Sequence, residues 1–360
     1  MKDKRIYYCD LLRLIAIIMV IAIHVFAEVR DLYVVQNIKI YFFLTLLDSF
    51  TRVGVPLFFM LTGIFMLNDK KEFRYLEFIK KRIPKLIIPL IIFSIIYYIY
   101  DSLYNNVPLS IISFIDKITS DNIKYHLWFM YYIIIIYIFI PFIKKLIQNI
   151  SKREQQILIT IIFIFGNVLK TINLFAVKYD YNFLRSFILP DLIIYINYVL
   201  LGYYLYNNDI SKNKRKTLYI LGIIFILLIP VFDYWYIEGL RYDIIPTAVS
   251  LFPFIPAIAF FTFIKNNYSK LKITKKTERM LSEISPLVFY IYMSHVLIMD
   301  LLKLAIKKVW IANSFIENMI VFVILVVGTF VVSISFSYYF NKIYNYIESK
   351  IKSITTKTEL

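Results

Sequence analysis

Residues 9–27 read CDLLRLIAIIMVIAIHVFA, an apolar run that only Asp10, Arg13 and His24 interrupt. As a helix, a run of this length crosses the roughly 30 Å hydrocarbon core of a bilayer. The basic residues before it resemble the start of a signal peptide, but no small-residue cleavage site follows. We therefore interpret the run as a retained first membrane span.

The same pattern recurs along the 360-residue chain, in which 60% of residues are hydrophobic and only 18% are charged. Soluble proteins have roughly 45–50% apolar residues, so a soluble fold is excluded. We predict an all-α, polytopic membrane helical bundle with about ten transmembrane helices. The predicted spans are residues 9–27, 40–67, 86–104, 127–143, 155–169, 188–206, 217–232, 244–264, 285–302 and 314–340.

The net charge of +17 is distributed unequally between the two sides of these spans. One set of alternate connecting segments holds 28 Lys and Arg residues and the other set holds 11. Positive charge is retained on the cytoplasmic side, so both termini are predicted to be cytoplasmic. The basic residues lie in short segments rather than on one folded surface, and we expect no nucleic-acid partner. With no linker or repeat, residues 1–345 form one membrane domain and residues 346–360 a short basic cytoplasmic tail.

The sequence contains no motif typical of a metal site or of a serine hydrolase. The single cysteine, Cys9, cannot form an intrachain disulfide or a thiolate cluster. The three histidines, His24, His126 and His295, belong to different predicted spans, and no H-x-x-x-H spacing or acidic cluster accompanies them. A Gly-x-Ser-x-Gly nucleophile elbow is also absent from the sequence. We expect no metal site.

Polar residues in the first span are the strongest candidates for chemistry. Arg13 and His24 project from one helical face about 16 Å apart along the axis, because eleven residues make slightly more than three turns. Asp10 lies one turn before Arg13 on the same face. Simpler roles stay open: Arg13 could extend to the lipid headgroups, Asp10 could neutralise it, and His24 could be an ordinary interfacial residue.

Four segments, in the same order, resemble motifs of the acyltransferase 3 family of integral membrane acyltransferases. The Arg and His of the first span are separated by ten residues, which is the hallmark of that family's first helix. The other three segments are residues 52–63, RVGVPLFFMLTG, with Thr62 where Ser is usual; residues 126–129, HLWF, followed by Tyr137 and Pro141; and residues 291–295, IYMSH.

Within that family, the pattern looks closest to stand-alone O-acetyltransferases of surface polysaccharides, of the type acting on enterobacterial common antigen. The resemblance implies a multi-pass protein of the bacterial cell membrane. It implies acetyl-CoA as a cytoplasmic acyl-donor substrate, no permanently bound cofactor, and a lipid-linked or cell-surface carbohydrate acceptor. Some relatives carry an additional extracytoplasmic hydrolase-like domain, which we do not expect here. The sequence does not distinguish acetyl from succinyl transfer, nor does it indicate an oligomeric state.

The resemblance gives Arg13 and His24 catalytic roles that suit their chemistry. An imidazole with an ordinary pKa of about 6.5 can remove a proton from a sugar hydroxyl at neutral pH. A guanidinium offers planar donors for the phosphates or the thioester end of coenzyme A. The further predicted substrate-binding residues are Asp10, Arg52, Arg82 of the basic loop 70–85, His126, Trp128 and His295.

Most of these substrate-binding residues have a simpler alternative role. Arg52 could form an ion pair with Asp48, and Arg82 could reflect only the charge bias of cytoplasmic loops. Trp128 could belong to an interfacial aromatic belt, and His295 could be a packing residue. The alternative for the whole protein is a transporter or flippase of a polysaccharide or its precursor. That class predicts inverted repeats and paired intramembrane acids, which the sequence does not show.

Overall fold

The computed structural model describes residues 5–33, 37–69, 74–106, 108–177, 181, 185–237, 248–306 and 315–358. These residues form helices and no strand. The α-helices are α1 (Tyr7–Tyr33), α2 (Ile38–Thr51), α3 (Gly54–Leu67), α4 (Tyr75–Arg82), α5 (Pro84–Asn105), α6 (Ile111–Thr119), α7 (Trp128–Asn149), α8 (Lys152–Ile162), α9 (Leu169–Val177), α10 (Asp191–Asn207), α11 (Lys212–Ile237), α12 (Leu251–Asn267), α13 (Lys275–Ile284), α14 (Val288–Ile306) and α15 (Phe315–Thr358). A π-helix, η1 (Phe163–Val168), and three 3₁₀ turns, η2 (Arg185–Phe187), η3 (Tyr268–Lys270) and η4 (Ser285–Leu287), join them.

Among the described residues, eight helical stretches are long and apolar enough to cross a membrane. They are Tyr7–Ala27, Ile38–Leu67, Tyr75–Asn105, Trp128–Asn149, Lys152–Val177, Lys212–Asp233, Lys275–Ile306 and Phe315–Lys350. The prediction of an all-α polytopic membrane bundle is confirmed. The helices α10 and α12 have 17 residues each. If both also cross the membrane, the number of spans is the predicted ten; that number stays a prediction.

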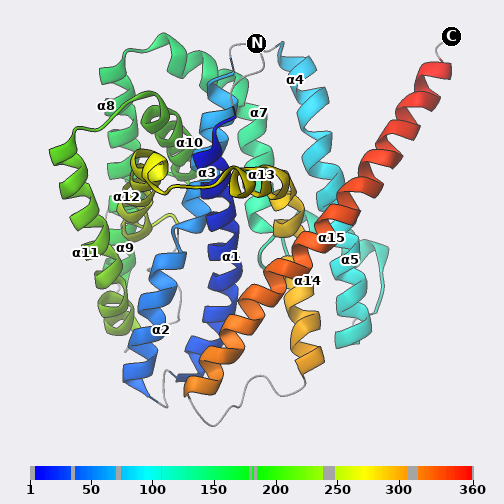
Figure 1. Ribbon diagram of the computed structural model, residues 1–360, viewed down its shortest axis with the longest axis horizontal. Helices are drawn as coiled ribbons and strands as arrows, with labels where there is room; N and C mark the ends of the chain where they lie inside the picture. The colour runs from blue at the N-terminus through cyan, green and yellow to red at the C-terminus, as the bar shows by residue number, and fades with distance from the viewer. Residues whose placement is uncertain are drawn as a thin grey trace.

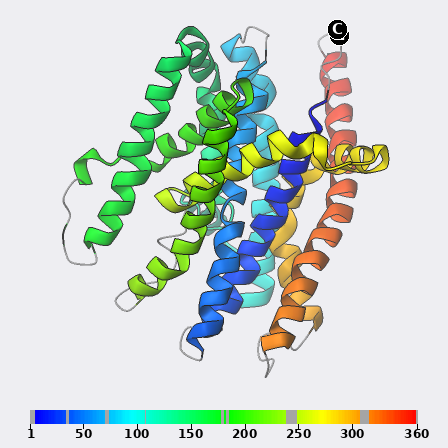
Figure 2. The same cartoon turned by 60° about the vertical axis from the view of Figure 1, so that its left-hand side comes forward.

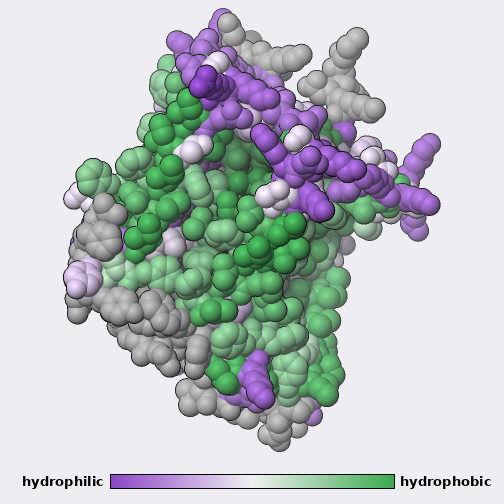
Figure 3. Space-filling model, turned by 90° about the vertical axis from the view of Figure 1, so that its left-hand side faces the viewer, coloured by the Kyte–Doolittle hydropathy of each residue, from purple (hydrophilic) through white to green (hydrophobic). Residues whose placement is uncertain are grey.

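Both ends of the described chain lie at one end of the bundle. Figures 1 and 2 show the start of α1 and the end of α15 on the same side. Figure 3 shows hydrophilic residues concentrated at that end, above a broad hydrophobic band. This arrangement agrees with an even number of crossings, while the cytoplasmic orientation stays a prediction. The expected domain boundary at residue 345 falls inside α15, which continues unbroken to Thr358.

Helix α1 occupies the centre of the bundle. In the apolar stretch of α1, 72% of the residues are buried. In the corresponding stretch of α15, at the periphery, 22% are buried. It packs against α2, α3, α14 and α15. A helix that is apolar on all sides is expected to be buried among other helices, as α1 is here. Its polar residues therefore lie inside the protein rather than in lipid.

The predicted second span, residues 40–67, is broken into two helices. Helix α2 ends at Thr51 and α3 begins at Gly54. The hydroxyl of Thr51 donates to the carbonyl of Asp48, and Pro56 cannot supply a backbone N–H to continue the ladder. This break places Arg52 at a helix junction in the middle of the bundle, where a continuous helix was predicted.

Two other predicted spans differ from the observed helices. The short span predicted at 155–169 is part of a longer stretch, Lys152–Val177, in which η1 interrupts the α-helix. The amide of Asn167 in η1 donates to the carbonyls of Val249 and Ser250 before α12. In the predicted span 244–264, Pro253 and Pro256 lie within α12, which is continuous from Leu251 to Asn267. Pro246 lies outside the described residues.

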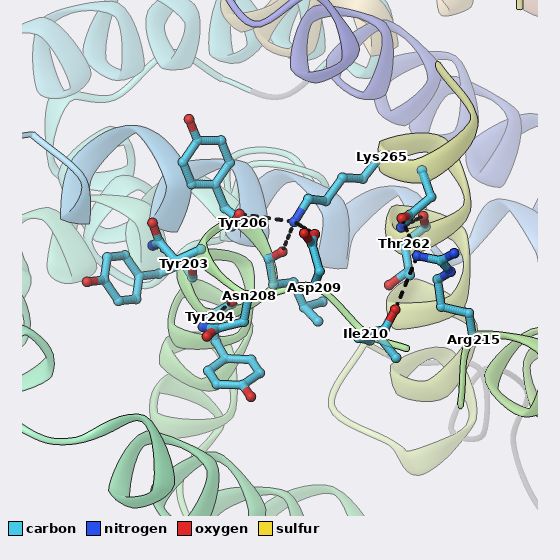
Figure 4. Close-up of polar contacts among 12 residues, drawn as sticks. Tyr203, Tyr204, Tyr206, Asn208, Asp209, Ile210, Arg215, Thr262 and Lys265 are labelled. Carbon is cyan, nitrogen blue, oxygen red and sulfur yellow. Dashed lines mark hydrogen bonds and ion pairs between the residues drawn. The ribbon is translucent and has the colours of Figure 1, made fainter. Parts of the chain in front are cut away.

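A polar clamp joins the ends of α10, α11 and α12 (Figure 4). The Lys265 ammonium donates to the carbonyls of Leu205 and Tyr206, at 2.7 and 3.0 Å, and to the Asp209 carboxylate at 2.9 Å. The hydrogen bond with Lys265 lowers the pKa of Asp209 below its ordinary value. Arg215 extends the clamp by donating to Asn266 and to the carbonyl of Ile210. The clamp satisfies carbonyls that the end of α10 would otherwise leave unpaired.

Candidate active site

Two cavities lie inside the bundle on either side of its middle. The first, called here the arginine cavity, has a volume of about 360 Å³ and contains Arg13 in its wall. The second, called here the histidine cavity, has a volume of about 320 Å³ and contains His24 in its wall. Because Arg13 precedes His24 along α1, the arginine cavity lies nearer the end of the bundle that holds the start of α1. The first helix thus serves both cavities.

Arg13 is fixed by polar contacts at the base of α1. Its Nη1 donates to the Ser285 hydroxyl at 2.6 Å and lies 3.7 Å from the Asp10 carboxylate. Its guanidinium carbon lies 4.9 Å from the centre of the Phe65 ring, within cation–π range. The side chain remains 26% exposed, so it presents a positive charge to the arginine cavity.

Asp10 lies behind Arg13 and outside the described walls of both cavities. Its carboxylate accepts from Nε of Arg5 at 2.7 Å, and Arg5 also donates to the Ser282 carbonyl. These contacts support the neutralising role for Asp10, and its predicted contact with substrate stays a prediction. Sequence reasoning missed Arg5, although its position five residues before Asp10 is compatible with such a pair.

The three histidines, which belong to different predicted spans, lie close together in the structure. The ring centres of His24 and His295 are 5.3 Å apart in a stacked arrangement, and those of His126 and His295 are 4.9 Å apart. His24 and His126 are separated by 6.4 Å. Nevertheless, among the described residues no group of three His, Cys, Asp or Glu side chains is arranged to hold a metal ion. The absence of a metal site stays a prediction.

The three rings differ in their access to the histidine cavity. His24 and His126 line it, whereas His295 is not among the described residues of either wall. His295 is fully buried, and its Nδ1 lies 2.6 Å from the Tyr292 carbonyl. A carbonyl can only accept, so Nδ1 carries the proton and Nε2 is an acceptor. Neither Nε2 of His295 nor the ring nitrogens of His126 have a hydrogen-bond partner among the described residues.

Arg52 also lines the histidine cavity. The Nη2 of Arg52 lies 2.7 Å from the Asp48 carboxylate, so the predicted ion pair is present. The Arg52 side chain is 14% exposed and is part of the cavity wall, whereas the Asp48 side chain is 1% exposed and is not part of the described wall. A contact between Arg52 and a substrate stays a prediction.

Trp128 belongs to an aromatic wall of the same cavity. Its ring centre lies 5.5 Å from that of Tyr195 and 5.8 Å from that of Tyr132. Asp191, the first residue of α10, is also part of the wall and pairs with Lys170. Sequence reasoning missed Asp191 and Tyr195, although a carboxylate inside the predicted span 188–206 was a usable signal. A flat ring beside polar groups is a surface on which a sugar can stack.

Arg82 is not part of either described cavity wall. The basic segment that contains it is helical, because residues Tyr75–Arg82 form α4, and it is not the loop that was expected. Lys70 and the three residues after it lie outside the described residues. A contribution of Arg82 to donor binding stays a prediction.

Comparison with known proteins adds one positive finding. A family model described as an acyltransferase domain matches residues 6–338. Comparison with curated proteins gives no significant match, and comparison with solved structures gives none either. The matched range includes every residue described above in the walls of the two cavities.

Proposed function

The chain belongs to the acyltransferase 3 family and is a membrane acyltransferase; from this premise, we propose that it is an O-acyltransferase. In this proposal it moves an acyl group, acetyl first among the candidates, from cytoplasmic acyl-CoA to a hydroxyl of a lipid-linked or cell-surface carbohydrate in the bacterial cell membrane. The observation that carries the proposal is the pair of cavities, one lined by Arg13 and the other by His24, that share part of their walls.

The arginine cavity suits an acyl-CoA donor. Its wall is mostly apolar, which fits a flexible pantetheine arm, and it contains the charged donors of Arg13 together with Ser285 and Tyr137. A guanidinium held by Ser285 and Asp10 keeps its planar fork in one orientation. It can therefore bind a phosphate or polarise a thioester carbonyl at low entropic cost.

The histidine cavity suits a carbohydrate acceptor. Trp128 and Tyr195 offer ring surfaces, and Asp191, Arg52 and the histidines offer polar groups for hydroxyls. His126 is 1% exposed and has two ring nitrogens that lack partners among the described residues. Leaving such groups unpaired is costly, so a hydroxyl-bearing ligand would satisfy them.

The reaction follows from these positions. His24 removes the proton of an acceptor hydroxyl, and the resulting oxygen attacks the thioester carbonyl carbon. The new C–O bond forms, the C–S bond breaks, and the proton passes from His24 to the departing thiolate. Protons and charges balance without a further reactant. The transporter alternative loses support because the matching family is one of acyltransferases.

The test uses purified protein in liposomes with radiolabelled acetyl-CoA and membrane glycolipids as acceptors. We expect labelled glycolipid from the parent, and about 10²–10⁴-fold less from His24→Gln, because a positioned base contributes that much. Arg13→Ala should raise the KM for the donor, and Arg13→Lys should recover only part of the affinity. The control is Arg74→Ala, which removes an exposed arginine that is not part of either described wall. Glycolipid movement without acylation in the parent would contradict the proposal.

A further inference from the structure

The two cavities share three residues, and all three are aromatic. Phe58 of α3, Phe129 of α7 and Tyr292 of α14 occur in the walls of both the arginine cavity and the histidine cavity. They come from three of the four segments that resemble family motifs. We call these three side chains the aromatic septum, because they lie where one cavity ends and the other begins.

The three rings of the septum are joined by contacts through Phe129. The ring centres of Phe58 and Phe129 are 6.0 Å apart, and those of Phe129 and Tyr292 are 5.2 Å apart. Aromatic rings at 4.5–7 Å are in contact, so no acyl chain fits between them. The Tyr292 hydroxyl donates to the His126 carbonyl, which holds that ring in place. Phe129 also packs against Phe59, with the ring centres 4.9 Å apart. Its side chain has no polar group, so its ring can move without breaking a hydrogen bond.

We infer that the aromatic septum is a gate through which the thioester end of the donor passes, with Phe129 as its moving part. The inference rests on the proposed function, in which the cation for the donor lies in one cavity and the base lies in the other. A thioester anchored near Arg13 reaches His24 only by displacing the septum. When no donor is bound, the rings close the connection between the two cavities.

A closed septum has a clear physical benefit for a membrane enzyme. A continuous polar lumen through the bundle would conduct protons and ions across the bilayer. An apolar constriction prevents this by excluding water, as in hydrophobic gates of channels. The same exclusion keeps water from the thioester before an acceptor arrives, which limits hydrolysis of the donor.

The test measures proton permeability in the absence of any substrate. The full-length protein is reconstituted in liposomes that contain a pH-sensitive dye, and a potassium diffusion potential drives protons inward. We expect parent liposomes to stay tight and Phe129→Ala liposomes to acidify several-fold faster. The control is Phe93→Ala, which removes a fully buried ring of α5 that packs against α15 and lies outside both described walls. Equal permeability of Phe129→Ala, Phe93→Ala and the parent would overturn the inference.

Further variants keep the test decisive. If Phe129→Ala does not fold, Phe129→Leu and Phe58→Ala open the same contact with smaller changes and should each raise permeability. A second readout is acetyl-CoA hydrolysis without acceptor, which should rise in the same variants. A leaky Phe129→Ala together with a parent that transfers no acyl group would refute the proposed function and the passage of a donor, and would leave the septum only as a constriction between the cavities. Normal transfer by the parent with tight septum variants would refute the septum alone.

Discussion

At the scale of single residues, the first prediction concerns His295, which is fully buried and is not part of either described cavity wall. His295 stacks on His24 and is pinned through Nδ1 to the Tyr292 carbonyl, so we expect it to hold the His24 ring rather than to touch the substrate. In His295→Asn the side-chain amide can keep the bond to Tyr292 while the ring is lost. We predict a kcat reduced on the order of tenfold to a hundredfold, as for misplaced catalytic groups, with an unchanged KM for acetyl-CoA. Parent-like kcat in a well-folded His295→Asn would show that the ring only fills space.

A second prediction at this scale concerns pH and the loop before α7. Partial burial raises the pKa of Asp121 to about 6, above the value of about 3.8 expected for the unfolded chain. The folded protein therefore binds the proton more tightly, and stability is lost as the pH rises from about 4 to about 6. Asp121 has a φ of 58°, a left-handed conformation that Asn also accepts.

Replacement of this carboxyl by the neutral Asp121→Asn should remove that loss. We expect the Tm of Asp121→Asn to exceed that of the parent at pH 7 and to match it near pH 4. Thermal unfolding in detergent, followed by tryptophan fluorescence at both pH values, checks this. A parent that becomes more stable as the pH rises from 4 to 6, relative to Asp121→Asn, would contradict the assigned direction of the pKa shift.

At the scale of elements, the contact between α3 and α10 positions both cavities. A Cβ at Gly63 would lie 1.9 Å from the Val199 carbonyl oxygen, and one at Gly202 would lie 2.0 Å from the Met60 carbonyl oxygen. Small residues allow such close approach of membrane helices. Helix α3 supplies Phe58 and Thr62 to the arginine cavity, and α10 supplies Asp191 and Tyr195 to the histidine cavity. Both helices line the histidine cavity, so their separation affects the width of that cavity.

Gly202→Ala and Gly63→Ala should each force the two helices apart. We expect a large loss of stability, of several kcal/mol, because backbone atoms cannot yield as side chains do. Gly328→Ala is the matched control, since a Cβ there would meet only Leu302 at an ordinary 3.5 Å. The measurement is the midpoint of unfolding in a detergent–denaturant titration. Equal midpoints for the Gly202 and Gly328 variants would show that α3 and α10 are not in the close contact that the two glycines indicate.

At the scale of the whole molecule, the sequence predicts the helical bundle and the segments that line its cavities. It does not predict which side chains of different segments meet. Apolar runs and the charge bias identify membrane helices because the bilayer imposes both, whatever the tertiary packing. The segments with family motifs do supply α1, α3, α7 and α14 to the cavities. The meeting of His24, His126 and His295, however, depends on which helices become neighbours, and periodicity within one helix carries no such information.

The same limit explains the other differences. The break at Arg52 depends on local hydrogen bonds around Asp48 and Thr51, which hydropathy averages over. The π-helix η1 is bonded through Asn167 to the residues before α12, and the septum joins α3, α7 and α14, so both involve segments distant in sequence. A continuous apolar run predicts that a span exists; it does not predict where the helix is interrupted or which side chains meet in its interior.

In the proposed function, donor and acceptor approach from opposite ends of the bundle, so the sidedness of transfer is the decisive measurement. Sealed vesicles are prepared with the end that carries the start of α1 facing outward, acetyl-CoA is added outside only, and a water-soluble carbohydrate acceptor is present on one side at a time. We expect labelled acceptor when the carbohydrate is trapped inside, and much less when it is outside, with His24→Gln inactive in both cases. Labelling only of acceptor on the same side as acetyl-CoA would contradict it.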